Sequence, residues 1–130
     1  MDYSFADVNL NEAQDLKTVP SGEYKVVIVD TEVNEEKYYF LIKLEVEGQD
    51  AFTKRVRHFV FFPKPDDDRE KKNNKLLGLK RFCQAFGIDQ AQLRDPDTFV
   101  GKRGTAILKE KDDGQYGLQN EVGSFSAFRG

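Results

Sequence analysis

The chain has 130 residues, which is enough for one domain with a hydrophobic core of its own. Hydrophobic residues make up 38% of it, including 11 Phe and 5 Tyr, so the composition is that of a folded protein and not of a disordered segment. The lone cysteine, Cys83, excludes an internal disulfide and a cysteine-rich zinc site. The lone histidine, His58, excludes most chemistry that depends on imidazole groups.

No stretch of the sequence has the pattern of a secretory leader or an apolar run of about 18 residues. We therefore expect a soluble protein in a reducing, cytoplasmic setting, with no membrane partner.

The net charge is −3, but the charges are unevenly distributed. Residues 1–50 carry 4 basic and 12 acidic residues, a net charge of −8, whereas residues 51–109 carry 14 and 7, a net charge of +7. Residues 110–130 carry 2 and 4. The middle of the chain could therefore form a basic groove on an acidic body, unless the fold mixes these charges again.

Two strands are predicted in the first part of the chain. The turn Pro20-Ser21-Gly22 precedes Glu23–Thr31, whose nearly continuous apolar run predicts a long, bent strand buried on both faces. Tyr38–Glu47 alternates between apolar and polar residues. Its predicted inward residues are Tyr38, Phe40, Ile42, Leu44 and Val46, and its predicted outward residues are Tyr39, Leu41, Lys43, Glu45 and Glu47.

The third predicted strand, Lys54–Phe62, has an unusual outer face. A period of two places Val56, His58, Val60 and Phe62 on one face and Arg55, Arg57, Phe59 and Phe61 on the other. Two arginines followed by two phenylalanines suit a polyanion with flat bases. The other interpretation is a central strand buried on both faces, with the arginines at its open end.

A helix is predicted after a charged loop. Pro63-Lys64-Pro65 ends the sheet, and Asp66–Lys72 is expected to be a solvated loop without the spacing of a calcium site. Asn73 or Asn74 could cap a helix that runs to about Phe86 and stops at Gly87. Its apolar stripe is predicted to consist of Leu76, Leu79, Phe82, Cys83 and Phe86.

Two further strands, Thr105–Lys109 and Tyr116–Phe125, are predicted around the turn Asp112-Asp113-Gly114. The sequence therefore divides into an N-terminal arm, residues 1–19, and one domain, residues 20–126. The fold class is mainly β: a five-stranded OB-fold-like barrel with one helix between strands three and four. A small open α+β sheet is the competing architecture.

Several short motifs resemble a phage-encoded family long catalogued as a domain of unknown function. They are Pro20-Ser21-Gly22-Glu23-Tyr24, the helix from Leu76 to Ile88, Gly101-Lys102 and Asn120-Glu121-Val122, within residues 20–125. The resemblance implies an OB-type protein, similar to single-stranded-DNA-binding proteins, that acts in replication and recombination within a bacterial host cell. It implies no catalytic residues. The chain departs from many such binders because its last residues, Ser124–Gly130, are not an acidic tail.

Binding of single strands requires cations for the phosphates and flat rings for the bases. The predicted nucleic-acid-binding residues are Tyr39, Lys43, Lys54, Arg55, Arg57, Phe59, Phe61, Lys102, Arg103 and Tyr116. We expect non-sequence-specific binding to single-stranded DNA, with no cofactor, metal or enzymatic activity, because no phosphate loop, nucleophile motif or metal-binding helix is present. Replication or recombination proteins are further expected partners, and a homo-oligomer is compatible with the sequence.

The alternative is a protein-interaction module, a phage accessory factor that binds a host or recombinase partner through the same rings. The acidic first 50 residues favour this alternative, and the basic middle of the chain favours DNA binding.

Overall fold

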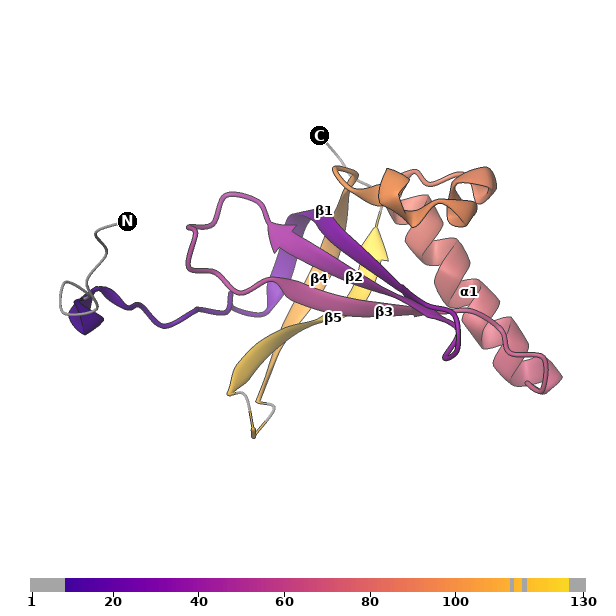
Figure 1. Cartoon of the computed structure of the whole chain (residues 1–130), viewed down its shortest axis with the longest axis horizontal. Coiled ribbons are helices and arrows are strands. Elements are labelled where there is room, and N and C mark those ends of the chain that lie inside the picture. The colour runs from indigo at the N-terminus through magenta and orange to yellow at the C-terminus, as the bar shows by residue number, and fades with distance from the viewer. Residues whose placement is uncertain (1–8, 113, 116, 127–130) are drawn as a thin grey trace, which may run out of the picture.

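The computed structural model describes residues 9–112, 114–115 and 117–126. Five antiparallel strands form one sheet in the order β3-β2-β1-β4-β5. Their bounds are β1 Gly22–Asn34, β2 Tyr39–Val46, β3 Val56–Phe61, β4 Arg103–Asp112 and β5 Leu118–Ser126. The sheet curls until its edge strands β3 and β5 approach each other, and the helix α1, Arg69–Phe86, packs against both (Figure 1). The prediction of an OB-like barrel with one helix between strands three and four is confirmed.

The long strand β1 is shared between the two halves of the barrel. Its first part, Gly22–Val27, pairs with β4, and its pairing with β2 continues to Asn34. A β-bulge at Val29 separates two registers, because Ile28 lies opposite Leu44 whereas Asp30 lies opposite Lys43. A bulge bends its strand and increases its twist, which is what closing a five-stranded sheet requires.

The barrel is filled by the inward side chains of the strands and closed at one end by α1. Ile28, Ile42, Leu44 and Leu108 are fully buried between the strands. Phe82 of α1 packs against Phe86 and against Phe99 of the short 3-10 turn η4, Pro96–Phe99. Gly104 lets the helix approach β4, because a Cβ there would lie 2.9 Å from the Phe86 ring.

At the end of the barrel opposite α1, residues 17–19 before β1 contact the chain just before β3 and then β5. Lys17 and Thr53 form an isolated parallel bridge, and the Lys17 carbonyl accepts a hydrogen bond from the Lys54 N–H at 2.7 Å. The buried Asn120 amide then makes two 2.9 Å hydrogen bonds to the main chain of Val19. This segment therefore adds backbone hydrogen bonds where the two edge strands of the sheet meet.

Four details of the predicted elements were wrong. β1 is not buried on both faces, because Val26 and Ile28 are its only buried residues. The helix begins at Arg69, capped by Asp68, whose carboxylate accepts a hydrogen bond from the Lys71 N–H, so most of the expected charged loop is helical. Leu76 lies off the buried stripe, which is formed by Leu79, Phe82, Ala85 and Phe86. Tyr38 is in a turn with positive φ, where it cannot continue the inward face of β2.

The described part of the N-terminal arm extends away from the barrel on the side opposite α1 (Figure 1). It contains a short 3-10 turn, Leu10–Glu12, and its Leu10 and Leu16 side chains are exposed. Within the described residues, no helix combines the length and the apolar character needed to cross a membrane.

Candidate nucleic-acid interface

Three aromatic rings form one cluster on the outer face of β2 and β3. Tyr39 lies opposite Phe61 in the strand register, and its ring meets Phe59 edge-on at a centroid distance of 5.1 Å. Phe59 and Phe61 are stacked at 6.2 Å, with an interplanar angle of 22°. Phe59 is 41% exposed and Phe61 is 48% exposed. The sequence prediction that Phe59 and Phe61 lie on the outer face of this strand therefore agrees with the structure.

Leu41 lies on the same outer face as this cluster, opposite Phe59. It was expected to point outward, and the register does place it on the outer face between Phe59 of β3 and Glu32 of β1. It is nevertheless only 4% exposed, because its neighbours on the sheet cover it. The rings thus rest on apolar support outside the barrel interior. Such support holds them in place for contact with a ligand.

The basic residues beside the rings are mostly paired with acids. Lys43 lies 3.3 Å from Glu32 and 3.6 Å from Asp30, which the bulge at Val29 brings to the outer face of β1. The Arg55 side chain lies 3.3 Å from Glu45. The positive charges of Lys43 and Arg55 are therefore balanced by acidic residues of β1 and β2.

Arg57 differs from these cations. It lies opposite Lys43 in the register, two residues before Phe59, and is exposed. Among the described residues it forms no ion pair. Its guanidinium is thus available for a phosphate beside the rings, or for stacking on an aromatic ligand.

Four other predicted residues do not join the ring cluster. Lys54 donates to the Leu118 carbonyl at 2.7 Å where β3 meets β5, and Lys102 donates to the Gly87 carbonyl at 3.4 Å after α1. Arg103, at the start of β4, pairs with Glu47, and this hydrogen bond raises the pKa of the guanidinium. Tyr116 lies outside the described residues.

A groove of about 270 Å³ adjoins the ring cluster between β3 and α1. His58, Phe59 and Phe61 line it from the strand, and Asn74, Lys75, Gly78 and Leu79 line it from the helix. Lys75 is held by a 2.7 Å ion pair with Asp67, and this contact lowers the pKa of that carboxyl group.

The helix wall of this groove was not predicted as part of a site. The sequence signal for it is Gly78, because glycine in a helix interior costs about 0.5–1 kcal/mol relative to alanine. Gly78 lies in the middle of α1, where no turn or cap calls for a glycine.

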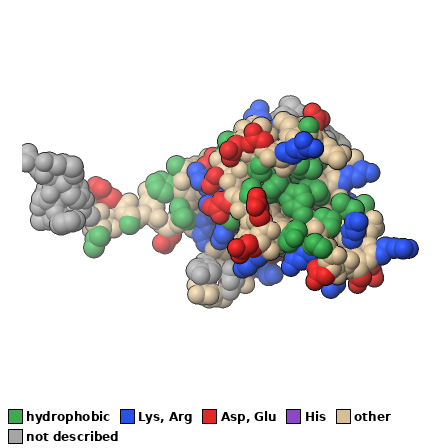
Figure 2. Space-filling model, turned by 45° about the vertical axis from the view of Figure 1, so that its right-hand side comes forward, with side chains coloured by type: hydrophobic (Ala, Val, Ile, Leu, Met, Phe, Trp, Pro, Cys, Tyr) green, Lys and Arg blue, Asp and Glu red, His purple; other side chains and the backbone are tan. Residues whose placement is uncertain are grey.

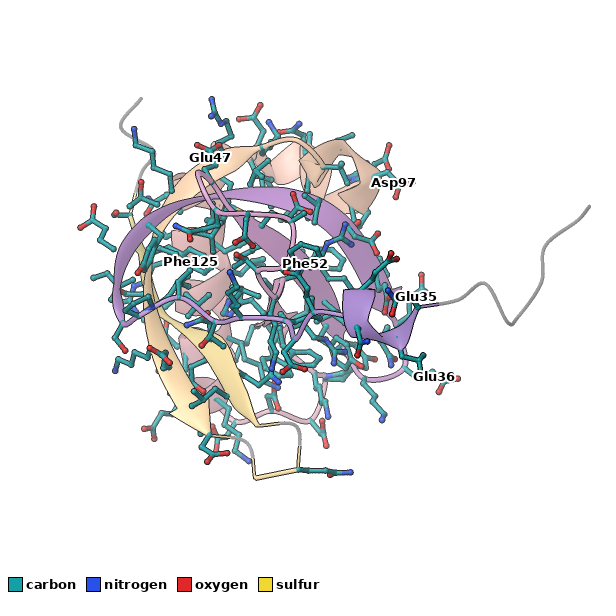
Figure 3. All side chains as sticks on the ribbon, turned by 90° about the vertical axis from the view of Figure 1, so that its left-hand side faces the viewer. Glu35, Glu36, Glu47, Phe52, Asp97 and Phe125 are labelled. Atoms are coloured by element: carbon teal, nitrogen blue, oxygen red, sulfur yellow. The ribbon has the colours of Figure 1, made fainter. Side chains whose placement is uncertain are left out.

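The turn that joins β1 to β2 brings acidic residues close to the rings. Glu35 and Glu36 are exposed on this turn, and Figure 3 shows both at the outer edge of the barrel, whereas Phe125 lies toward its interior. A polyanion bound on the rings would therefore be repelled by this turn.

A second groove, of about 520 Å³, lies between α1 and the 3-10 turn η3, Gln90–Arg94. Leu76, Leu79, Cys83 and Leu93 contribute its apolar lining, and burial raises the pKa of the Cys83 thiol. Figure 2, seen from nearer the α1 side, shows hydrophobic side chains gathered in one area, with charged side chains around it. A thiol with a raised pKa is a poor nucleophile at neutral pH, so Cys83 supports no catalytic role.

The three successive aspartates before α1 have structural contacts. Asp67 accepts hydrogen bonds from the Lys64 N–H and from Lys75, and Asp68 caps the helix. Across the described ranges, no group of three or more His, Cys, Asp and Glu side chains is arranged to hold a metal ion.

Residues 6–121 match the model of the family described as "Protein of unknown function (DUF669)". No curated protein matches the chain. The family match agrees with the resemblance to a domain of unknown function, and it covers β1 to β4, α1 and the start of β5, together with part of the arm. By this match, the chain belongs to the DUF669 family.

Proposed function

We propose that this protein binds single-stranded DNA, with little sequence preference, on the outer face of β2 and β3. The observation that carries the proposal is the cluster of Tyr39, Phe59 and Phe61, in which the two phenylalanines are exposed and Tyr39 is half-buried. Arg57, which forms no ion pair with any described residue, lies beside them. In OB-type barrels the face of strands two and three is the usual oligonucleotide surface. Exposed rings stack with bases of any sequence, which accounts for the low selectivity.

The proposed role is a binding one, without catalysis, in phage-type DNA replication or recombination. The resemblance of the sequence motifs to a phage-encoded family supports that setting. Replication or recombination proteins would then be partners that meet the protein on DNA.

The ion pairs on the outer face set the expected character of binding. Lys43 and Arg55 already interact with carboxylates, so few phosphates are neutralised without breaking an ion pair. The log–log dependence on salt has a slope of about −0.7 for each phosphate neutralised on a single strand. We therefore expect a shallow salt dependence, with stacking supplying much of the affinity.

Fluorescence anisotropy of a labelled oligo-dT, compared with duplex DNA at two salt concentrations, tests the proposal. The wild-type protein should prefer the single strand. Phe59→Ala should weaken binding by about 1–3 kcal/mol, the contribution of one stacked base. Phe59→Leu should lose nearly as much, because leucine keeps an apolar side chain but has no ring to stack.

Phe52→Ala is the matched control. Phe52 is an exposed phenylalanine in the loop between β2 and β3. Figure 1 shows this loop at the end of the strands away from α1, whereas Tyr39 and Phe61 lie at the other end of the β2–β3 pair. Its removal should leave DNA binding unchanged. Equal affinity for single and double strands, unaffected by Phe59→Ala and by Arg57→Ala, would refute the proposed function.

One observation favours a second function, that of a protein-interaction module. Acids paired with Lys43, Arg55 and Arg103 make the outer face nearly neutral, which suits a protein partner as well as it suits a nucleic acid. In that case a defined partner should co-purify after nuclease treatment, and Phe61→Ala should release it. Phe59→Leu should then retain most of the interaction, in contrast to its effect on base stacking.

A further inference from the structure

Gly78 has no explanation within the described chain. Its backbone is an ordinary right-handed helix, with no positive φ to favour glycine. A Cβ added at this position would meet no atom within 4 Å, so no neighbouring side chain or strand requires the space. Gly104 is the contrasting case, where a Cβ would collide with Phe86. The position of Gly78 is therefore open and solvent-exposed.

That space belongs to the groove between α1 and β3. Phe59 and Phe61 form its strand wall, and Asn74 and Gly78 form part of its helix wall. The Asn74 side chain makes no hydrogen bond within the described structure and is exposed. An asparagine amide has both a donor and an acceptor and can pair with the edge of a nucleobase.

The helix also places a positive charge at the groove. Lys71 lies one turn before Asn74 and Lys75, and Arg81 lies about one turn after Gly78, so these side chains follow the same flank of α1. Lys71 is exposed. Of these cations, Lys75 lines the groove itself, where it is paired with Asp67. Lys71 and Arg81, like Arg57 on β3, are exposed on the two elements that form the walls.

We infer that the groove receives one unstacked nucleobase of the single strand. The inference depends on the proposed function, because it extends the strand from the ring cluster onto α1. Phe59 or Phe61 offers the base a ring to stack on, Asn74 meets its hydrogen-bonding edge, and the bare backbone at Gly78 leaves room for it. The groove thereby extends the binding face from β3 onto α1.

Gly78→Leu fills the groove and tests this inference. Because the site is open and glycine disfavours helix, the substitution should leave the thermal midpoint unchanged or raised. Affinity for an oligo-dT should fall at least fivefold, and the number of nucleotides covered per protein should decrease. Asn73→Leu, on an exposed face of α1 away from the groove, is the matched control and should leave both quantities unchanged.

A second variant tests the contact with the base edge. Oligo-dA, oligo-dC and oligo-dT should differ modestly in affinity for the wild-type protein, and Asn74→Ala should reduce these differences.

The outcomes separate the two proposals. If Phe59→Ala weakens binding but Gly78→Leu does not, the groove is not part of the interface and DNA binding by the rings still stands. If the wild-type protein binds no single strand, the proposed function fails and the groove proposal fails with it. A lowered thermal midpoint for Gly78→Leu would overturn the premise that the space is open.

Discussion

His58 alternates with the outer-face residues of β3 but points into the barrel. Its ring meets Phe125 of β5 edge-on at a centroid distance of 5.0 Å, and burial lowers the pKa of the imidazole to about 4. The folded protein therefore holds this ring neutral at pH values where the unfolded chain, with a pKa near 6.5, begins to bind a proton. As the pH falls from 6.5 toward 4, protonation stabilises the unfolded state and the free energy of unfolding decreases.

The decrease in the free energy of unfolding that is due to His58 should reach at most about 3 kcal/mol near pH 4. Urea unfolding at several pH values between 7 and 4 measures it, and His58→Leu should show a smaller decrease over this range. The carboxyl groups of Asp50 and Asp67 have lowered pKa values, so their contributions are lost at more acidic pH and are common to both proteins. Identical pH profiles for the two proteins would show that His58 does not titrate as a buried group.

At the scale of single elements, the contact between Asn120 and the segment before β1 is the most specific one. The Asn120 side chain is 8% exposed and satisfies both the N–H and the C=O of Val19, itself only 3% exposed. Removing it leaves two buried main-chain groups without partners, which costs more than the loss of two solvent-exposed hydrogen bonds.

Asn120→Ala should therefore lower the free energy of unfolding by about 2–3 kcal/mol. Urea denaturation checks the magnitude, with Ser124→Ala, an exposed residue of β5, as the control. Amide hydrogen exchange should also become faster at Val19 and at Lys54, whose N–H donates to the Lys17 carbonyl. Unchanged exchange at these amides would mean that the segment is held by its other contacts.

Some features of the strands and the helix could be predicted from the sequence alone, and others could not. Alternation is a local property, so the two faces of β3 and the inward position of His58 could be predicted. Turn residues between the apolar runs also allowed the succession of strands and helix along the chain to be predicted. The start of α1 could not, because its first turn of charged residues resembles a solvated loop until the cap at Asp68 is recognised. The burial of Leu41 depends on cross-strand neighbours, which a single strand does not reveal.

For the candidate site, the aromatic rings could be predicted better than the charges. Phe59 and Phe61 owe their outer position to the period of two in their own strand. The neutralisation of Lys43 depends on Asp30 and Glu32, which reach it only because the bulge shifts the register of β1 by one residue. The helix side of the groove depends on how α1 docks against β3, which composition and spacing did not indicate.

At the scale of the whole molecule, acidic and basic regions of the sequence meet on one face. The net charge of −8 in residues 1–50 and +7 in residues 51–109 suggested separate surfaces. The sheet order instead places β2 between β1 and β3, so acids of the first region pair with cations of the second. The fold thus balances much of the positive charge on this face.

Asp30→Asn combined with Glu32→Gln should release Lys43 from its ion pairs. Affinity for oligo-dT should increase, and the salt dependence should become steeper by about 0.7 in log–log slope, as expected for one additional phosphate contact. Anisotropy titrations at several salt concentrations measure both changes. Glu121→Gln, which removes an acid paired with Lys111 away from the ring cluster, is the control for net charge. If Glu121→Gln increased the affinity for oligo-dT equally, the effect would be due to overall charge and not to Lys43.

The bulge at Val29 has a consequence for how this segment can evolve. If β1 continued through Val29 without a bulge, Val29 would lie opposite Lys43 and Asp30 opposite Ile42, so the second half of the strand would turn Asp30 and Glu32 toward the interior. Carboxylates cannot be buried there without partners. Deletion of Val29 would remove the extra residue and leave Asp30 opposite Lys43, whereas a one-residue deletion between Asp30 and Asn34 would shift the register and exchange the faces of the residues beyond it.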